Sequence, residues 1–171
     1  DAPFTPQQPA MLSAGQSLLK AALQRDILLS YPYESMEPFL QMIREAANDP
    51  AVLAIRITIY RLASKAKLVE YLCAAAENGK DVTALIELRA RFDEQNNIDW
   101  SKHLEEAGCT VIYGFDDYKV HSKLTLITKK SAHGYSYITQ IGTGNYNEKT
   151  SELYTDYSFI TADLGIGEEA S

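Results

Sequence analysis

The chain has 171 residues, of which 46% are hydrophobic and 23% are charged, proportions typical of one globular domain with a sizeable core. Its net charge of -7 argues against nucleic-acid binding over the whole surface, so any site for a polyanion has to be a local basic cluster. No apolar run approaches the roughly 18 residues of a membrane span. The two cysteines are too few for a disulfide scaffold, which favours a reducing, intracellular location.

The start of the chain has neither an initiator methionine nor a signal-peptide pattern, so we expect a piece of a longer protein. Residues 1–16 contain three prolines and little periodicity, and we interpret them as a connector to a single domain over residues 17–171. Apolar residues at helical spacing predict helices over residues 17–29, 36–47, 68–78 and 99–107. Apolar, β-branched or alternating runs predict strands over residues 51–60, 82–88, 109–113, 119–128, 136–142 and 154–160.

This order of elements predicts an α/β sandwich, with a central mixed and largely parallel sheet flanked by helices. The first three of these six strands are separated by helices, and such crossovers require parallel pairing. The last strands are separated by short links, which favour some antiparallel pairing.

The tripeptide His121-Ser122-Lys123 is the first candidate for chemistry. On a strand, residues i and i+2 point the same way, so His121 and Lys123 are expected to project together. A neutral imidazole can attack phosphorus, and a neighbouring ammonium can stabilise the phosphate oxygens as charge shifts. Taken alone, the tripeptide is more typical of a solvated histidine and lysine on a half-exposed strand.

A second candidate follows about 20 residues later, where Gly142, Thr143, Gly144 and Asn145 come after a predicted strand. Glycines let backbone N–H groups approach an anion closely, and the Asn145 amide can donate to phosphate. The alternative is a plain turn in which the glycines supply unusual dihedral angles.

Arginines follow two predicted strands: Arg61 after the first, and Arg89 and Arg91 after the second. Ligands bind beyond the carboxyl ends of strands in open α/β sheets, and arginine can fork onto phosphate oxygens. Salt bridges to Asp93 or Glu94 are the alternative. The sequence contains no P-loop, no zinc motif and no clustered carboxylates, and His103 and His133 are expected to be solvated.

The His-x-Lys tripeptide followed by Gly-Thr-Gly-Asn resembles one half of a phospholipase D-type site, in which a histidine forms a covalent phospho-enzyme. The full motif of that superfamily has an aspartate five residues after the lysine, where this chain has Thr128. A phosphodiesterase that works as a dimer stays open as an alternative function, as does a non-catalytic phosphate-binding module.

Five longer blocks are similar to the long, histidine-phosphorylated polyphosphate kinases: LLSYPYESMEPFL, AIRITIYRLA, ELRARFDEQNNIDW, KVHSKLTLI and IGTGNYNEKTSELYTDYSFITAD. They lie in the family's order and cover nearly the whole chain. The resemblance implies a phospholipase D-like fold and the first of two such domains in a four-domain enzyme. It also implies reversible transfer of the terminal phosphate of ATP to polyphosphate through a phosphohistidine.

The resemblance also implies roles for particular residues. His121 corresponds to the phosphorylated histidine and Tyr154 to a tyrosine that contacts the nucleotide. Arg61 and Arg91 correspond to arginines associated with the Mg²⁺-nucleotide phosphates. Because a guanidinium has no lone pair to offer, we expect these arginines to bind the phosphates that the Mg²⁺ also binds. Lys123 and Asn145 are expected to hold the phosphate too.

The same resemblance implies the partners and the location. The substrates are ATP, ADP and inorganic polyphosphate, with Mg²⁺ as the cofactor and no nucleic acid. The remaining domains of the same enzyme complete the site, so the isolated fragment is expected to be inactive. The full-length protein is expected to be a cytoplasmic homo-oligomer, with peripheral membrane association left open.

Overall fold

The fold comes from a computed structural model, which describes residues 5–10, 12, 15–60, 66–87, 94–114, 120–146, 152 and 154–171. The strands are β1 (Ile27–Tyr31), β2 (Val52–Ile59), β3 (Asp81–Ile86), β4 (Thr110–Tyr113), β5 (Lys123–Ser131), β6 (Gly134–Gly142) and β7 (Asp156–Thr161). The helices are α1 (Leu18–Ala22), α2 (Glu37–Asn48), α3 (Lys67–Glu77), α4 (Glu94–Glu106) and α6 (Leu164–Ala170).

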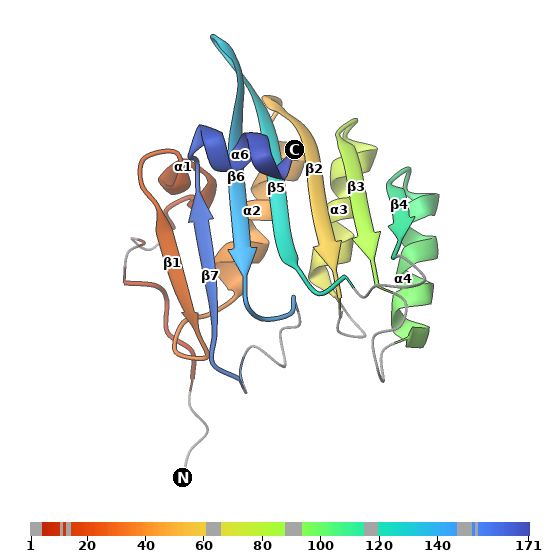
Figure 1. Ribbon diagram of the computed structural model, residues 1–171, viewed down its shortest axis with the longest axis horizontal. Coiled ribbons are helices and arrows are strands. Elements are labelled where there is room, and N and C mark those ends of the chain that lie inside the picture. The colour runs from red at the N-terminus through yellow and green to blue at the C-terminus, as the bar shows by residue number, and fades with distance from the viewer. Residues whose placement is uncertain are drawn as a thin grey trace.

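One mixed sheet organises the described part of the chain, with the strand order β1-β7-β6-β5-β2-β3-β4 (Figure 1). The α/β class and the mixed sheet are confirmed. The expectation of a largely parallel sheet is wrong, because only β2–β3 and β3–β4 are parallel. The pairs β1–β7, β7–β6, β6–β5 and β5–β2 are antiparallel. Parallel pairing is confined to the strands that helices α3 and α4 connect, as crossover geometry requires.

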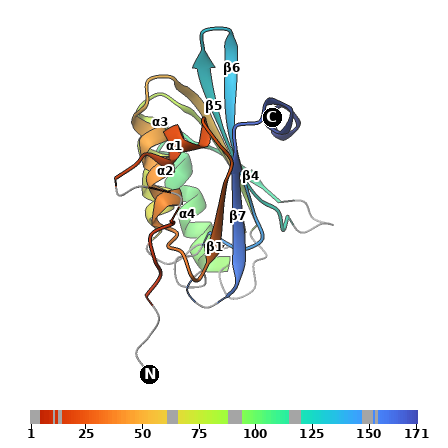
Figure 2. The same ribbon diagram turned by 90° about the vertical axis from the view of Figure 1, so that its left-hand side faces the viewer.

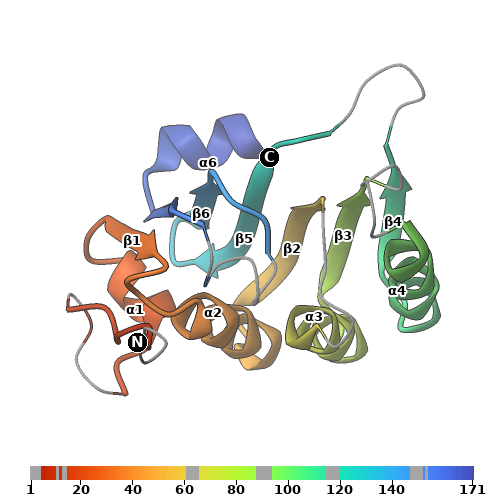
Figure 3. The same ribbon diagram turned by 90° about the horizontal axis from the view of Figure 1, so that it is seen from below.

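The helices lie in two unequal layers. Helices α1 to α4 cover one face of the sheet, and α6 lies on the other (Figures 2 and 3). The core sits under the first layer, where Phe39, Leu40, Ile43 and Ala47 of α2 are buried as their helical spacing predicts. No helix in the described ranges is both long enough and apolar enough to cross a membrane.

The prediction of one helix over residues 17–29 is wrong, because α1 ends at Ala22 and β1 follows. Within β1, Ile27, Leu29 and Tyr31 alternate with more exposed residues and are buried. The period is therefore that of a strand, and pairing with the distant β7 stabilises it. Within residues 1–16, the backbone of Gln7 bonds to that of the β1–α2 turn.

Strand β5 begins at Lys123 rather than at residue 119, so His121 lies just before the strand and not in it. Helix α6 was not predicted from the sequence. The expected element bounds are otherwise close, although α4 begins five residues earlier and β6 two residues earlier than the patterns indicate.

One edge of the sheet carries the candidate residues, and we call it the site edge. Strands β2 and β3 end there, with Ile59 paired to Ile86. Strand β5 begins there and β6 ends there, with Lys123 paired to Gly142. Because strand register fixes these neighbours, the His-x-Lys segment and the Gly-Thr-Gly-Asn segment lie beside the carboxyl ends of the parallel strands. The lower end of the sheet in Figure 1 is this edge.

Candidate active site

His121 and Lys123 are in contact at the start of β5. The Lys123 Nζ atom lies 3.0 Å from His121 Nδ1 and donates to the His121 carbonyl oxygen at 2.5 Å. The expectation that the two side chains project together is therefore confirmed, although a strand does not align them. Instead, the lysine folds back over the residue that precedes its strand.

Lys123 is held in an unusual setting for a lysine, because only 3% of its surface is exposed. Its Nζ atom lies 5.1 Å from the centre of the Tyr60 ring, and a cation over an aromatic face is stabilised there. The Tyr60 ring also meets the His121 ring edge-on, with centroids 4.8 Å apart. His121 itself is exposed, so the pair combines a fixed ammonium with an imidazole that solvent or substrate can reach.

The contact between the two side chains fits one tautomer of the histidine when Lys123 is charged. A lysine ammonium has donor hydrogens only, so Nδ1 acts as the acceptor and the neutral ring carries its proton on Nε2. In this arrangement the lone pair of Nδ1 accepts from Lys123, and the electron pair of the protonated Nε2 belongs to the aromatic ring, so neither nitrogen is free to attack.

The Gly-Thr-Gly-Asn segment packs against β7 more closely than its sequence indicates. The Thr143 backbone N–H donates to the Tyr157 carbonyl at 3.0 Å, and the Thr143 hydroxyl donates to Asp156 at 3.0 Å. The N–H of Thr143 is thus not available to an anion. A Cβ on Gly144 would overlap the Asp156 carboxylate, so glycine is needed there for close approach.

Asn145 has an amide oxygen that is buried and has no hydrogen-bond partner among the described residues. Beside it lies a cavity of about 10 Å³, which Gln140 and Ser158 also line and which is about the smallest that can hold one water molecule. The next residue, Tyr146, is buried under the segment and hydrogen-bonds to Thr125 and Gln140. These buried hydrogen bonds fix Tyr146, and with it the adjacent Asn145 near the site edge.

Other predicted residues stand differently. Arg61, Arg89 and Arg91 lie outside the described residues. Tyr154 lies at the site edge two residues before β7 and is 64% exposed, with its side chain open to a ligand. The structure thus brings together His121 and Lys123, with Asn145 at the same edge, and leaves Tyr154 exposed there.

Sequence reasoning missed Tyr60 and Asn97. Tyr60 directly follows β2 at the site edge, a position at which an aromatic residue is unremarkable in sequence. Asn97, which is fully buried on α4, donates from Nδ2 to the carbonyls of Tyr60 at 3.1 Å and Glu87 at 2.9 Å. It therefore joins the two points from which the chain continues to Arg61 and Arg91. Sequence pattern could not have marked it, because Asn97 lies two residues before the helix predicted over residues 99–107.

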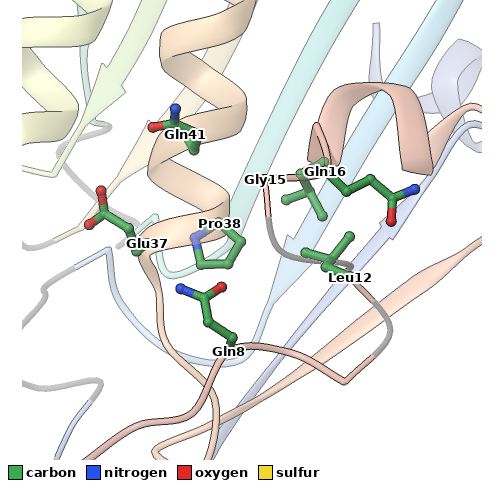
Figure 4. A pocket seen from close by; sticks show the side chains of 8 residues that line it. Gln8, Leu12, Gly15, Gln16, Glu37, Pro38 and Gln41 are labelled. Atoms are coloured by element: carbon green, nitrogen blue, oxygen red, sulfur yellow. The ribbon is translucent and has the colours of Figure 1, made fainter.

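The described residues offer no group of three or more His, Cys, Asp or Glu side chains able to hold a metal ion. A pocket of about 220 Å³ lies between the N-terminal segment and the start of α2 (Figure 4). Three glutamine amides line it together with Glu37 and Pro38, and none of its lining residues was predicted to act on phosphate.

Comparison with known proteins places this geometry in a family. Residues 17–171 match the family model for the polyphosphate kinase C-terminal domain 1. The polyphosphate kinase of Staphylococcus epidermidis is 47% identical over 167 residues, which cover 98% of this chain and 23% of that protein. The chain thus spans about a quarter of the length of the curated relatives it matches.

Solved structures agree. The crystal structure of polyphosphate kinase from Porphyromonas gingivalis superposes with a TM-score of 0.83 at 34% identity, covering 96% of this chain and 28% of that one. The phospholipase D family member Nuc from Salmonella typhimurium gives a TM-score of 0.64 at 16% identity, covering 85% of this chain and 88% of that one, a likeness of fold. With the His121–Lys123 pair at the edge of a phospholipase D-like sheet, the chain belongs to the polyphosphate kinase family, as its C-terminal domain 1.

Proposed function

We propose that the longer protein containing this chain moves the terminal phosphate of ATP onto polyphosphate and back, with His121 carrying the phosphate between the two substrates. The contact between Lys123 Nζ and His121 Nδ1 at 3.0 Å is the observation that carries the proposal. It brings an imidazole and an ammonium together in an otherwise acidic chain with a net charge of -7, and transfer through a histidine would need such a nucleophile with a cation beside it.

The reaction would proceed in two displacements. A lone pair of the imidazole attacks the γ-phosphorus of ATP, an N–P bond forms, the bond to the β–γ bridging oxygen breaks, and ADP leaves with that electron pair. A terminal oxygen of polyphosphate then attacks the same phosphorus, the N–P bond breaks, and the chain is one phosphate longer. The other ring nitrogen keeps its proton throughout, so the phosphorylated ring stays positively charged and is a good leaving group.

Lys123 has to move off Nδ1 for either ring nitrogen to react. Attack by Nδ1 needs the lone pair that the lysine occupies. Attack by Nε2 needs the ring proton on Nδ1, where the lysine again stands in the way. The oxygens of an incoming phosphate are stronger acceptors for an ammonium than an imidazole nitrogen is, so substrate binding itself would draw Lys123 away and free the ring.

Other residues would complete the phosphate and nucleotide sites. We place Arg61, Arg91 and Asn145 around the phosphates, and Tyr154 against the nucleotide base. The described residues do not form a ligand set for Mg²⁺, so the ion would enter with the nucleotide and be held by its phosphates. When bound, it supplies neutralisation of phosphate charge.

The other parts of the longer protein would supply the rest of the basic groups, because this chain alone is acidic. The 171-residue chain by itself is therefore expected to show little phosphotransfer. The use of ATP favours a cytoplasmic location, and we keep a homo-oligomer of the full-length protein as part of the proposal.

The test uses the full-length protein with ATP and a polyphosphate primer. Replacing His121 with Ala should lower polyphosphate synthesis, and ATP formation in reverse, by at least about 10³-fold, as loss of a covalent nucleophile does. Full activity of this variant would refute the proposal. Release of an alcohol from a phosphodiester without ATP would instead identify a phosphodiesterase.

A further inference from the structure

The backbone around His121 lies beyond the end of the sheet. Antiparallel pairing between β2 and β5 runs as far as Ile57 opposite Thr125, and β5 itself begins at Lys123. Residues 120–122 consequently have no ladder bonds to β2. Backbone without such bonds opens easily unless other groups satisfy it, and here the partners are side chains.

Thr58 supplies one of these partners. Its hydroxyl oxygen accepts from the Leu124 backbone N–H at 2.9 Å and donates to the Ser122 carbonyl at 2.7 Å. These are the bonds that a strand backbone would make if the β2–β5 ladder continued. The hydroxyl therefore stands in for the ladder on the C-terminal side of His121.

Glu87 supplies the partner on the N-terminal side. Its Oε2 atom accepts from the Val120 backbone N–H at 3.0 Å, while only 3% of the residue is exposed. The Glu87 backbone is fixed in turn, because its N–H donates to the Ile59 carbonyl at 3.0 Å and its carbonyl accepts from Asn97. Because β2, β3 and α4 all fix the Glu87 backbone, its carboxylate accepts from Val120 at a well-defined position.

We propose that Thr58 and Glu87 are positioning residues for the phosphotransfer reaction, which hold the backbone on both sides of His121 and so fix the place of its ring at the site edge. The inference rests on the proposed function for its catalytic meaning. Its physical reason is that an attacking nitrogen has to stay within a fraction of an ångström of its line to phosphorus, and a shift of about 1 Å can cost roughly 10²-fold in rate. Each residue acts through the backbone groups that it hydrogen-bonds.

The Thr58→Val variant of the full-length protein tests the first half of the grip, since valine keeps the shape and removes the hydroxyl. Single-turnover formation of phosphohistidine from ATP should slow by about 10- to 100-fold, while nucleotide affinity stays within about twofold because nucleotide contacts are untouched. Thr58→Ser keeps the hydroxyl and should recover most of the rate. Thr83→Val is the matched control, because Thr83 lies on the neighbouring strand β3 and its hydroxyl has no hydrogen bond to residues 120–124 in the described ranges.

Amide hydrogen exchange in the same proteins gives a readout that does not depend on activity. Thr58→Val should speed exchange at Leu124, and Glu87→Ala should speed it at Val120, because each N–H loses its acceptor. Glu87→Gln retains an acceptor oxygen and should exchange nearly as the wild type does.

The outcomes separate the two ideas. Wild-type exchange at residues 120–124 in both Thr58→Val and Glu87→Ala would overturn the grip, and so would a wild-type rate of labelling in both variants. Equal slowing in the Thr83→Val control would also overturn it, because a general loss of stability would then explain the effect. If the wild-type protein itself forms no phosphohistidine, the proposed function fails, and faster exchange alone would still support the grip on this segment.

Discussion

Tyr146 offers a test of the buried hydrogen-bond network next to the Gly-Thr-Gly-Asn segment. It is buried, and its ring stacks on Phe39 of α2 with centroids 5.0 Å apart. Burial raises the pKa of its hydroxyl far above the usual range, so the group stays protonated and donates to Gln140 Oε1 at 2.5 Å. The Thr125 hydroxyl lies 2.9 Å from the Tyr146 hydroxyl, and the Gln140 amide donates in turn to the Ser158 hydroxyl at 3.0 Å.

Replacing Tyr146 with Phe removes one oxygen and keeps the stacked ring. Gln140 and Thr125, both buried, then lose a partner that no solvent replaces. An unsatisfied buried polar group costs about 1–3 kcal/mol, and the Thr125 hydroxyl can partly relieve its loss by rotating. The free energy of unfolding should therefore fall by about 2–4 kcal/mol, out of a total of roughly 5–15 kcal/mol for a domain. The melting temperature should fall by roughly 4–16 °C.

Urea unfolding of the 171-residue chain, followed by circular dichroism, measures this change. The midpoint should drop with an unchanged denaturant slope, because the surface exposed on unfolding stays the same. Tyr157→Phe is the control, since Tyr157 is 48% exposed and its replacement should change stability by less than about 0.5 kcal/mol. Equal midpoints for the two variants would show that the buried hydroxyl network contributes nothing to stability.

Three further predictions concern other parts of the fold. Asn97→Ala leaves two backbone carbonyls without their donor and should lower the free energy of unfolding by about 2–4 kcal/mol, measured as a shift in urea midpoint. A shift within error would show that these two hydrogen bonds do not stabilise the fold. Burial opposes ionisation of Asp49, but hydrogen bonds from Lys129 and the backbone, together with nearby lysine charges, hold its pKa below the ordinary value. The ionised Asp49 therefore contributes fully to the free energy of unfolding above about pH 4, and this contribution is lost as the pH falls further. The stability gap between wild type and Asp49→Asn should accordingly close on acidification, and a gap that widens would reverse the sign. Burial and the nearby Cys73 raise the pKa of Cys109 to about 12, and burial raises that of Cys73, so both thiols should react with a disulfide reagent at least about 100-fold more slowly in the folded chain than in urea; rapid labelling would place them at the surface.

Local sequence pattern predicted the strands whose own residues are clearly of the β-forming type. The run over residues 51–60 is β-branched and apolar, and it forms β2 with its bounds shifted by one residue at each end. Strand β1 was not predicted, because its five residues directly follow a segment with helical spacing of apolar residues. What makes Ile27–Tyr31 a strand is pairing with β7, more than 120 residues away, and such pairing leaves no local signal.

The candidate site shows the same division. His121 and Lys123 could be found from their spacing and their family resemblance, and their contact is confirmed. Thr58 and Glu87 could not, because a threonine in one strand and a glutamate just after the next strand are ordinary in sequence. Their importance follows from where the β2–β5 ladder stops, and only the assembled sheet determines that point.

The most direct measurement is the site of phosphate attachment in the full-length protein. After brief exposure to ATP, mass spectrometry under alkaline conditions that preserve N–P bonds should find phosphate on His121. Replacing His121 with Ala should abolish the label, and replacing either of the chain's other two histidines, His103 or His133, should leave it unchanged. Phosphate on another residue, or labelling that survives the loss of His121, would contradict the account.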